Sequence, residues 1–409
     1  MEKQRKDLLA IYKAAIGAVA GDQVVEQHLG AKANRYNRAC HVIAIGKVAD
    51  AMMQGALKVL QQKLLSGLVI SKTDTFSKKL KHHSRIRCIA GDHPIPAKKS
   101  LQAGQELLHY IQQLPSNAEC LLLISGGTSS LVEVLADDLS LEDLQAFNHY
   151  LLASGQDIHH INAVRKRLSA IKNGGLWQFL APRKVRCLMI SDVRGDDPSI
   201  IGSGLLFNTP QTHSLSTLLP SSLYNKLPPL KSSPSIPKHF DWHIIACLDD
   251  AKLAAQAEAD RLGYSTHIVK EFMQGSAEAM GQHAVAVLQD SEYALLIWGG
   301  ETTVELPKNT PKGGRNQQVA LSAAVALQGK QNQYVLAIAS DGVDGTSLEA
   351  GALVDGLSMQ RGELFGLSAI EALKQTNATL FLEESGDLIY TGASQTNVMD
   401  LLIALKIET

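Results

Sequence analysis

Residues 121–133 read LLLISGGTSSLVE, and this stretch decides the fold class. A continuous apolar run ends abruptly in two glycines and three hydroxyl residues. An apolar run without alternation is typical of a strand covered on both faces of a parallel sheet. Residues 295–305, LLIWGGETTVE, repeat the same order of strand, double glycine and hydroxyl residues. The chain therefore carries two strand ends of the same unusual kind.

The rest of the first half alternates short apolar strands with helical stretches. We expect strands at 41–46, 66–71, 86–90, 120–125 and 185–193, and helices at 47–64, 100–114 and 139–155. This order of elements predicts βαβ units. The expected fold class is α/β, with an N-terminal Rossmann-like domain of three layers (α/β/α) and a mainly parallel sheet. A smaller α/β domain is expected to follow it.

The length of 409 residues favours two domains. A stretch rich in proline and serine, residues 208–239, holds six of the 13 prolines and has no helical periodicity. We interpret it as a linker region and place the N-terminal domain at 1–235 and the C-terminal domain at 236–409. The amphipathic helix expected at the N-terminus could pack on either domain.

Charge and composition exclude several classes of protein. The formal net charge is −1, from 39 basic and 40 acidic residues, so no basic excess points to nucleic acid or to a membrane surface. The five cysteines are scattered and form no CxxC pair, which indicates reduced thiols. No apolar run is long enough to span a bilayer, and no signal peptide is recognisable. We expect a cytoplasmic protein. The sequence does not specify the oligomeric state, and a homodimer is kept open.

Candidate phosphate-binding residues follow the first and the fourth expected strands. Gly46 and Lys47 come directly before a helix, whose N-terminus favours anions. A surface lysine at a helix start is the alternative. The double-glycine stretch permits amides to point inward, although a structural turn is the commoner explanation. No GxxxxGK[ST] or GxGxxG is present. The candidates of this stretch are Ser125, Gly126, Gly127, Thr128 and Ser129.

Two charged segments complete the first half. Asn162 and Arg165 share a helix face that can hold a carboxylate or a phosphate, and a solvated basic helix is the alternative. Asp192 ends a strand, with Asp197 close behind. Clustered carboxylates suit Mg²⁺ with a nucleotide, whereas a capped turn is the structural explanation.

The second half offers a similar set of candidates. The echo of the double glycine precedes a second glycine pair at a helix start and an aspartate at a strand end. The histidines do not cluster at ligand spacing, and no GxSxG elbow is present. The candidates are Gly299, Gly300, Glu301, Thr302, Arg315 and Asp341.

In this order the motifs resemble the glycerate 2-kinase family, of the type with a MOFRL C-terminal domain. The resemblance covers nearly the whole chain. Departures from the family pattern occur at Arg167 and at 204–205, 248–250 and 275–277. The segments that carry the resemblance are GKVADAM, GDHPIP, ISGGTSSL, INAVRKRLSAIKNGGL, SDVRGDDPSIIGSG, GGETTVEL, GGRNQQVAL, SDGVDGTSLEAGALVD and TGASQTNVMDL.

The resemblance implies ATP-dependent phosphorylation of D-glycerate to 2-phosphoglycerate, with Mg²⁺, in a cleft between two α/β domains. It implies that Lys47 is the catalytic lysine and that Asp192 and Arg315 also serve catalysis. Asp192 would hold Mg²⁺ or accept the hydroxyl proton, with Asp197 as a second metal ligand. The two double-glycine stretches would face one bound substrate pair.

Two alternatives stay open. One is a nicotinamide-dependent hydroxypyruvate reductase, which the missing GxGxxG disfavours. The other is a sugar-acid-binding protein without catalytic activity.

Overall fold

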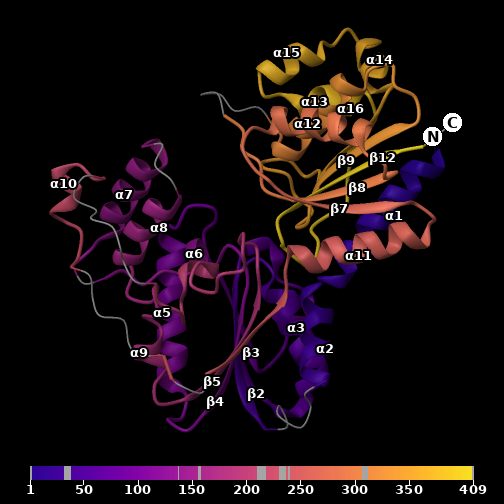
Figure 1. The fold of residues 1–409 in the computed structure, drawn as a ribbon. Coiled ribbons are helices and arrows are strands. Elements are labelled where there is room, and N and C mark those ends of the chain that lie inside the picture. Colours follow the sequence, from indigo (N-terminus) through magenta and orange to yellow (C-terminus); the bar gives the residue numbers. More distant parts are fainter. Residues whose placement is uncertain are drawn as a thin grey trace. The chain divides into compact units, whose positions relative to one another are not determined.

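The computed structural model describes residues 2–31, 38–136, 138–154, 158–209, 218–229, 236–237, 240–305 and 312–407. The chain forms two compact units (Figure 1). One unit comprises residues 21–245, and the other joins residues 1–20 to residues 246–409. We call them the Rossmann unit and the C-terminal unit.

The Rossmann unit is built on a six-stranded sheet in the order β3-β2-β1-β4-β5-β6. This order is that of a doubly wound dinucleotide-type fold. Strands β1 to β5 pair in parallel. The predicted Rossmann-like architecture is therefore confirmed. The strands are β1 (Cys40–Ile45), β2 (Leu64–Ser71), β3 (Ile86–Ala90), β4 (Glu119–Ile124), β5 (Lys184–Ile190) and β6 (Asp241–Ala246).

Helices cover both faces of this sheet, which explains the unbroken apolar strands. On one face α5 and α9 pack on β1 and β4 through Leu107, Ile43 and Leu122, all fully buried. On the other face lie α2 and α3 (Figure 1). The helices are α2 (Gly21–Ala31), α3 (Ala49–Leu60), α4 (Lys78–Lys81), α5 (Lys98–Gln113), α6 (Thr128–Leu131), α7 (Leu141–Ala153), α8 (Ile158–Arg167), α9 (Trp177–Leu180) and α10 (Ser221–Tyr224).

The C-terminal unit has its own six-stranded sheet, in the order β11-β10-β9-β12-β8-β7. Only β7 pairs with its neighbour in parallel, and the other pairings are antiparallel. Helices α12 and α13 pack on one face, and α1 and α11 on the other (Figure 1). Its strands are β7 (Thr266–Met273), β8 (Leu295–Gly300), β9 (Gln333–Ala339), β10 (Gly351–Asp355), β11 (Leu388–Ile389) and β12 (Asp400–Lys406). Its helices are α1 (Glu2–Ala18), α11 (Leu248–Arg261), α12 (Ala277–Asp290), α13 (Arg315–Leu327), α14 (Ser358–Glu363), α15 (Ala369–Lys374) and α16 (Ala378–Glu384).

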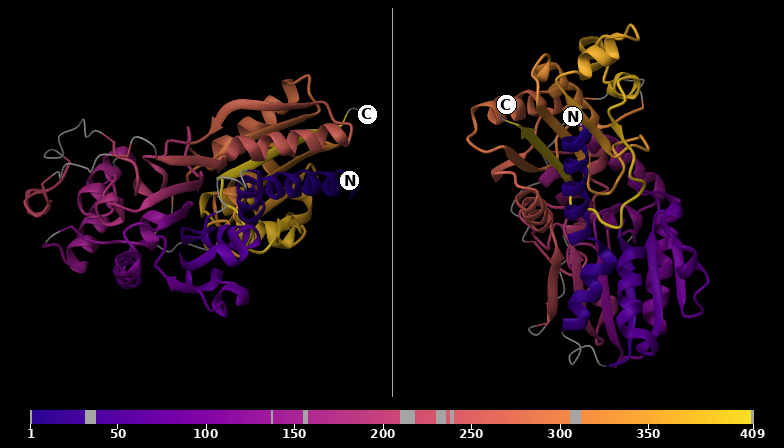
Figure 2. Two further views of the ribbon diagram at one scale, coloured as in Figure 1. Left: turned by 90° about the horizontal axis from the view of Figure 1, so that it is seen from below. Right: turned by 90° about the vertical axis from the view of Figure 1, so that its right-hand side faces the viewer.

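The observed division of the chain differs from the expected one at both ends of the Rossmann unit. Helix α1 belongs to the C-terminal unit, where it lies along α11 (Figure 2). Its Tyr12 hydroxyl donates to the carbonyl of Ala339 at 3.0 Å. Strand β6, expected in the second domain, extends the first sheet beside β5. Sequence periodicity identifies such elements but does not identify the sheet or helix against which they pack.

The expected linker, residues 208–239, lies partly outside the described residues, at 210–217, 230–235 and 238–239. Its described part includes α10, and the carbonyl of Pro228 accepts the Nε–H of Arg167 at 2.8 Å. Among the described residues, no single helix is long and apolar enough to cross a bilayer. Helices α1 and α2 pass that test only when they are counted together.

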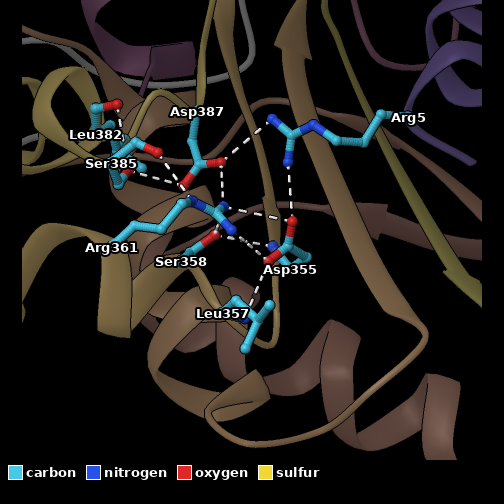
Figure 3. A network of polar contacts seen from close by, with 8 residues as sticks. All are labelled: Arg5, Asp355, Leu357, Ser358, Arg361, Leu382, Ser385 and Asp387. Carbon is cyan, nitrogen blue, oxygen red and sulfur yellow. Dashed lines mark hydrogen bonds and ion pairs between the residues drawn. The ribbon is translucent and has the colours of Figure 1, made fainter. Parts of the chain in front are cut away.

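A network of charges fixes α1 to the C-terminal unit (Figure 3). The guanidinium of Arg5 contacts Asp355 at 3.0 Å and Asp387 at 3.2 Å. Both carboxylates are almost fully buried, with side chains 5% and 1% exposed. Arg361 binds the same two carboxylates, at 2.9 and 2.6 Å. The two arginines together balance two buried negative charges, which would be costly to leave unpaired.

We therefore predict that Arg5→Met lowers the free energy of unfolding of the C-terminal unit by about 1–3 kcal/mol, because two buried carboxylates are then left with one cation, Arg361, between them. Thermal unfolding measures the effect as a fall of several degrees in Tm. Lys6→Met is the matched control, since Lys6 forms an exposed pair with Glu2. It should cost less than about 0.5 kcal/mol. Equal Tm values for the two variants would contradict a clamping role for Arg5.

Candidate active site

The carboxyl ends of β1 and β4 lie side by side and form the topological switch point of the Rossmann sheet. Ile45 pairs with Ile124 across the two strands. From β1 the sheet continues through β2 on one side, and from β4 through β5 on the other. Ligands of doubly wound folds bind outside the carboxyl ends of the strands at such a point. The predicted phosphate-binding residues after both strands therefore meet at this position.

The two strand ends are joined by a close approach at Gly46. Its φ is +130°, and a Cβ atom there would lie 2.2 Å from Oγ of Ser125. The Ser125 hydroxyl accepts the amide of Val48 at 3.1 Å, and the amide of Lys47 donates to Gly126 at 2.8 Å. A side chain at residue 46 would separate the two strand ends.

The double-glycine loop (residues 125–129) turns through Gly127, whose φ is +79°. Within the described residues, the bonds of the loop engage the amides of Ser125, Ser130 and Leu131 and leave those of residues 126–129 for a ligand. A Cβ on Gly127 would lie 3.0 Å from Cγ of Lys47 and 3.2 Å from a ring carbon of His93. The Lys47 side chain thus extends across this loop. Four successive amides beside the stem of a lysine form an environment that favours a phosphate.

The start of α3 contributes less than the sequence predicts. The amides of Lys47, Val48 and Ala49 donate to Gly126, Ser125 and Gly46, respectively. These N–H groups form hydrogen bonds that hold the ends of β1 and β4 together, and they do not point toward a ligand. The positive charge at the end of β1 therefore comes mainly from the side chain of Lys47.

Strand β5 brings the predicted metal ligands to the same edge of the sheet. Asp192 follows the strand, which pairs with β4. Asp197 accepts the amide of Ser199 on Oδ1 at 2.8 Å. Among the described residues, no group of three or more His, Cys, Asp or Glu side chains could hold a metal. Mg²⁺ needs only one or two carboxylates when phosphate oxygens and waters complete its shell. A site with only one or two carboxylates, as Asp192 and Asp197 could provide, is therefore compatible with Mg²⁺ that arrives bound to a nucleotide.

The basic residues of α8 do not form one cationic face. Lys166 donates to the carbonyl of Ser199 at 3.1 Å, and Arg167 holds the carbonyl of Pro228. Arg165 lines a pocket, and Asn162 lies on the same helix, half-buried. Ser169 lies beyond the helix end and forms an isolated β-bridge with Leu135.

The pocket lined by Arg165 lies beside the double-glycine loop, since Ser129 of the loop and the following Ser130 also line it. Sequence reasoning missed two of its polar residues, Asn148 and Glu133. Asn148 sits on an otherwise ordinary amphipathic helix, and nothing in its spacing marks it. Glu133 is the last residue of the stretch 121–133, but its partner, Lys172, is 39 residues away along the chain.

In the C-terminal unit, the predicted residues gather at one edge of the second sheet. Asp400, at the start of β12, pairs with Gly300 of β8 and with Ala339 of β9. Arg315 contacts Asp400 at 2.5 Å and also binds Glu301. Burial lowers the pKa of Arg315, but these two carboxylates outweigh burial and leave the pKa raised. Arg315 is therefore a cation whose charge is already compensated.

Nearby, two aspartates support the same edge. Asp341 accepts the amide of Val343 at 3.2 Å. Asp344, buried at the start of α13, accepts the amides of Asn316 and Gln317 at 3.0 and 2.8 Å. Burial raises the pKa of Asp344 to about 7, and these two amides oppose the rise. Asp400 is an acidic residue of this edge that sequence reasoning did not single out.

The second double glycine differs from the first. Gly299 and Gly300 lie inside β8, where a Cβ would meet Leu248 at 2.7 Å and the carbonyl of Met273 at 2.3 Å. The amide of Glu301 donates to Met273 at 2.8 Å. Thr302 is buried, and its hydroxyl has no partner among the described residues. These glycines serve close packing and do not form a turn like that of residues 125–129.

Two family models match this chain. The model described as domain of unknown function DUF4147 matches residues 7–229, and the MOFRL family model matches residues 294–400. The first spans more than half of the chain.

Named relatives match over nearly the whole length. D-glycerate 2-kinase of Thermotoga maritima is 32% identical, with 99% of each chain covered. Glycerate 2-kinase of Pyrococcus horikoshii is 31% identical, with 96% of this chain and 93% of the relative covered. A protein of Agrobacterium vitis, provisionally named a hydroxypyruvate reductase, is 34% identical over 88% of this chain and 98% of its own.

A solved structure agrees with these relatives. The crystal structure of glycerate kinase from Thermotoga maritima has a TM-score of 0.85 and 30% sequence identity, over the whole of both chains. The sequence resemblance is thereby confirmed, and the chain belongs to the glycerate kinase family that combines a DUF4147 domain with a MOFRL domain.

Proposed function

We propose that this protein transfers a phosphoryl group from ATP to the 2-hydroxyl of D-glycerate. The observation that carries the proposal is the placement of Lys47 across the double-glycine loop at the switch point of the sheet. Four loop amides and the stem of Lys47 lie there, and Asp192 and Asp197 follow the neighbouring strand β5. The names of the full-length relatives support the same reaction.

Phosphoryl transfer needs positioning and charge neutralisation more than covalent chemistry. Lys47 would stabilise the negative charge of the transferred group, and the amides of residues 126–129 would orient its oxygens. The close approach at Gly46 fixes the lysine relative to the loop. No bond of the protein needs to form or break.

ATP would bring Mg²⁺, which neutralises part of the phosphate charge. Asp192 and Asp197 are the residues proposed to hold it. Asp192 could instead accept the proton of the 2-hydroxyl, and both roles require its carboxylate form.

Arg315 is the residue of the C-terminal unit that is predicted to serve catalysis. Because Arg315 is paired with Asp400 and Glu301, we propose that it acts by orienting Glu301 and not as a phosphate clamp by itself. Gly299, Gly300, Thr302 and Asp341 stay predicted binding residues. That both double-glycine stretches face one substrate pair also stays a prediction.

The provisional reductase name of one relative defines the second candidate function. The sheet order is that of dinucleotide-binding folds, but the turn after β1 reads GKV and lacks the glycines that let a pyrophosphate approach. We therefore favour the kinase.

One experiment compares the two candidate functions: ADP release in a coupled assay with ATP and D-glycerate, against NADH oxidation with hydroxypyruvate. Glycerate-dependent ADP release with 2-phosphoglycerate as product is expected. NADH oxidation without ADP release would overturn the proposal.

Replacing Lys47 tests the electrostatic role. Lys47→Met keeps the stem that crosses Gly127 but removes the charge, and we predict a fall in kcat of about 10²–10³-fold, as for one lost transition-state donor. The coupled ADP assay measures it. Lys81→Met, at an exposed lysine of the same unit, is the control and should retain normal turnover. Near-normal kcat in Lys47→Met would remove Lys47 from the mechanism.

Crowding the loop tests its geometry. Gly127→Ala adds a methyl group 3.0 Å from the Lys47 side chain and also strains a left-handed residue. We predict a fall in kcat/KM of about tenfold or more, since small misplacements of catalytic groups cost that much. Gly366→Ala is the matched control: its φ is +76° and nothing lies within 4 Å of the new methyl group. It should lose about 1–2 kcal/mol of stability but keep its activity. Equal activity in both variants would contradict the proposed contact.

A further inference from the structure

A cavity of about 80 Å³ opens in the Rossmann unit next to the double-glycine loop. A space of this size holds several water-sized groups, and therefore a small organic acid but not a nucleotide. It is lined by Pro94, Pro96, Ser129, Ser130, Glu133, Leu144, Asn148, Arg165 and Lys172. All of these residues belong to one compact unit, so the shape of the cavity depends on that unit alone.

Asn148 gives this cavity an unusual polar wall. Its side chain comes from α7 and is only 2% exposed. Among the described residues, neither its amide nitrogen nor its carbonyl oxygen has a hydrogen-bond partner. Burying such groups without partners costs free energy, and folded proteins rarely leave both ends of one carboxamide unpaired. A carboxamide beside a cavity can satisfy both ends with one hydroxyl, which donates to the oxygen and accepts from the nitrogen.

The charged walls of the cavity add a binding site for one anion. Lys172 and Glu133 form an ion pair at 2.5 Å, with side chains 2% and 1% exposed. Arg165 faces the same space, and its Nε has no partner among the described residues. Burial lowers the pKa of Arg165, while the charge of Glu133 opposes that effect. Two cations and one carboxylate leave a net charge of +1 among the described lining residues. One carboxylate of a ligand would balance it.

The cavity also lies next to the reacting groups. Ser129 and Ser130 line it and lie two and three residues after Gly127, beside which the stem of Lys47 lies. An acid that places its carboxylate on Arg165 can therefore direct a hydroxyl toward the phosphate position at the loop. A second hydroxyl, on the next carbon of the acid, is then available to bind the carboxamide of Asn148 on another wall of the cavity.

We infer that this cavity is the acid subsite of the kinase, in which Arg165 binds the carboxylate of D-glycerate and Asn148 recognises its 3-hydroxyl. The inference rests on the proposed function, because it assigns the acceptor of that reaction to a place. Asn148 is then a specificity-determining residue. It selects acids with a hydroxyl on the third carbon over D-lactate, which keeps the carboxylate and the 2-hydroxyl but ends in a methyl group.

The replacement Asn148→Leu tests the assignment, because leucine matches asparagine in size and offers no hydrogen bond. We expect the ratio of kcat/KM for D-glycerate to kcat/KM for D-lactate to fall by about tenfold or more. The Tm of the ligand-free protein should be unchanged or raised, since two unpaired buried polar atoms are removed. An asparagine with a purely structural role would instead lower Tm and leave the ratio unchanged.

The control for this variant is Gln145→Leu, at an exposed position one turn earlier on α7. It should keep both the ratio and the Tm. An unchanged ratio in Asn148→Leu would overturn the role of Asn148. If that variant does not fold, the same ratio of kcat/KM values can be measured in Asn148→Ala, which also lacks the carboxamide but has a smaller side chain.

Arg165→Gln tests the carboxylate contact separately. We expect KM to rise by about tenfold or more for D-glycerate and D-lactate alike, because both acids lose the same charged partner. The ratio between the two acids should stay as in the wild type. An unchanged KM would overturn the role of Arg165.

A binding measurement separates the failure of this inference from the failure of the proposed function. D-glycerate without nucleotide should raise the Tm of the wild type, as any ligand of the folded state does, and Asn148→Leu should lose that shift. A wild type that shows this shift but releases no ADP would keep the subsite and refute the kinase. A wild type that phosphorylates D-glycerate while Asn148→Leu keeps both the shift and the ratio would keep the kinase and refute the subsite.

Discussion

The Rossmann unit depends on the contact between the ends of β1 and β4. Gly46 lies so close to Ser125 that only glycine fits, and the Ser125 hydroxyl ties the start of α3 to the end of β4. This contact places two loops from distant parts of the sequence within reach of one ligand. The lysine, the loop amides and the cavity all lie around it. A methyl group at this position would disturb all three together.

The two units use the same sequence pattern for different physical ends. After β4 the glycines leave the sheet, so their amides are available and their backbone turns through a left-handed residue. In β8 the glycines remain in the sheet and let Leu248 and Met273 approach. Where the C-terminal unit gathers charges, it pairs them, as Arg315 does with Asp400. Beside its cavity the Rossmann unit leaves the carboxamide of Asn148 and Nε of Arg165 without partners among the described residues, which costs stability and suits a binding site.

Much of the fold follows from the sequence, because parallel strands covered on both faces must be apolar throughout. The strands and the Rossmann-like class could be read in this way. The family was indicated by the order of the motifs, and the comparisons confirm it. The assignment of α1 and β6 to units could not be read. An amphipathic helix or an edge strand specifies that one face is buried, but not the surface that buries it. The antiparallel pairing of the second sheet could not be predicted either, because a buried strand does not specify the direction of its neighbours.

For the site, the sequence by itself determined the residues at strand ends, since glycines and charges directly after an apolar strand stand out locally. Lys47, residues 125–129 and Asp192 belong to this set. Only the tertiary structure decided which of the three basic residues of α8 reaches a cavity, and that Arg315 is neutralised by Asp400. It also decided that Asn148 is buried without partners. Burial and pairing depend on elements far apart in the chain, so no local pattern encodes them.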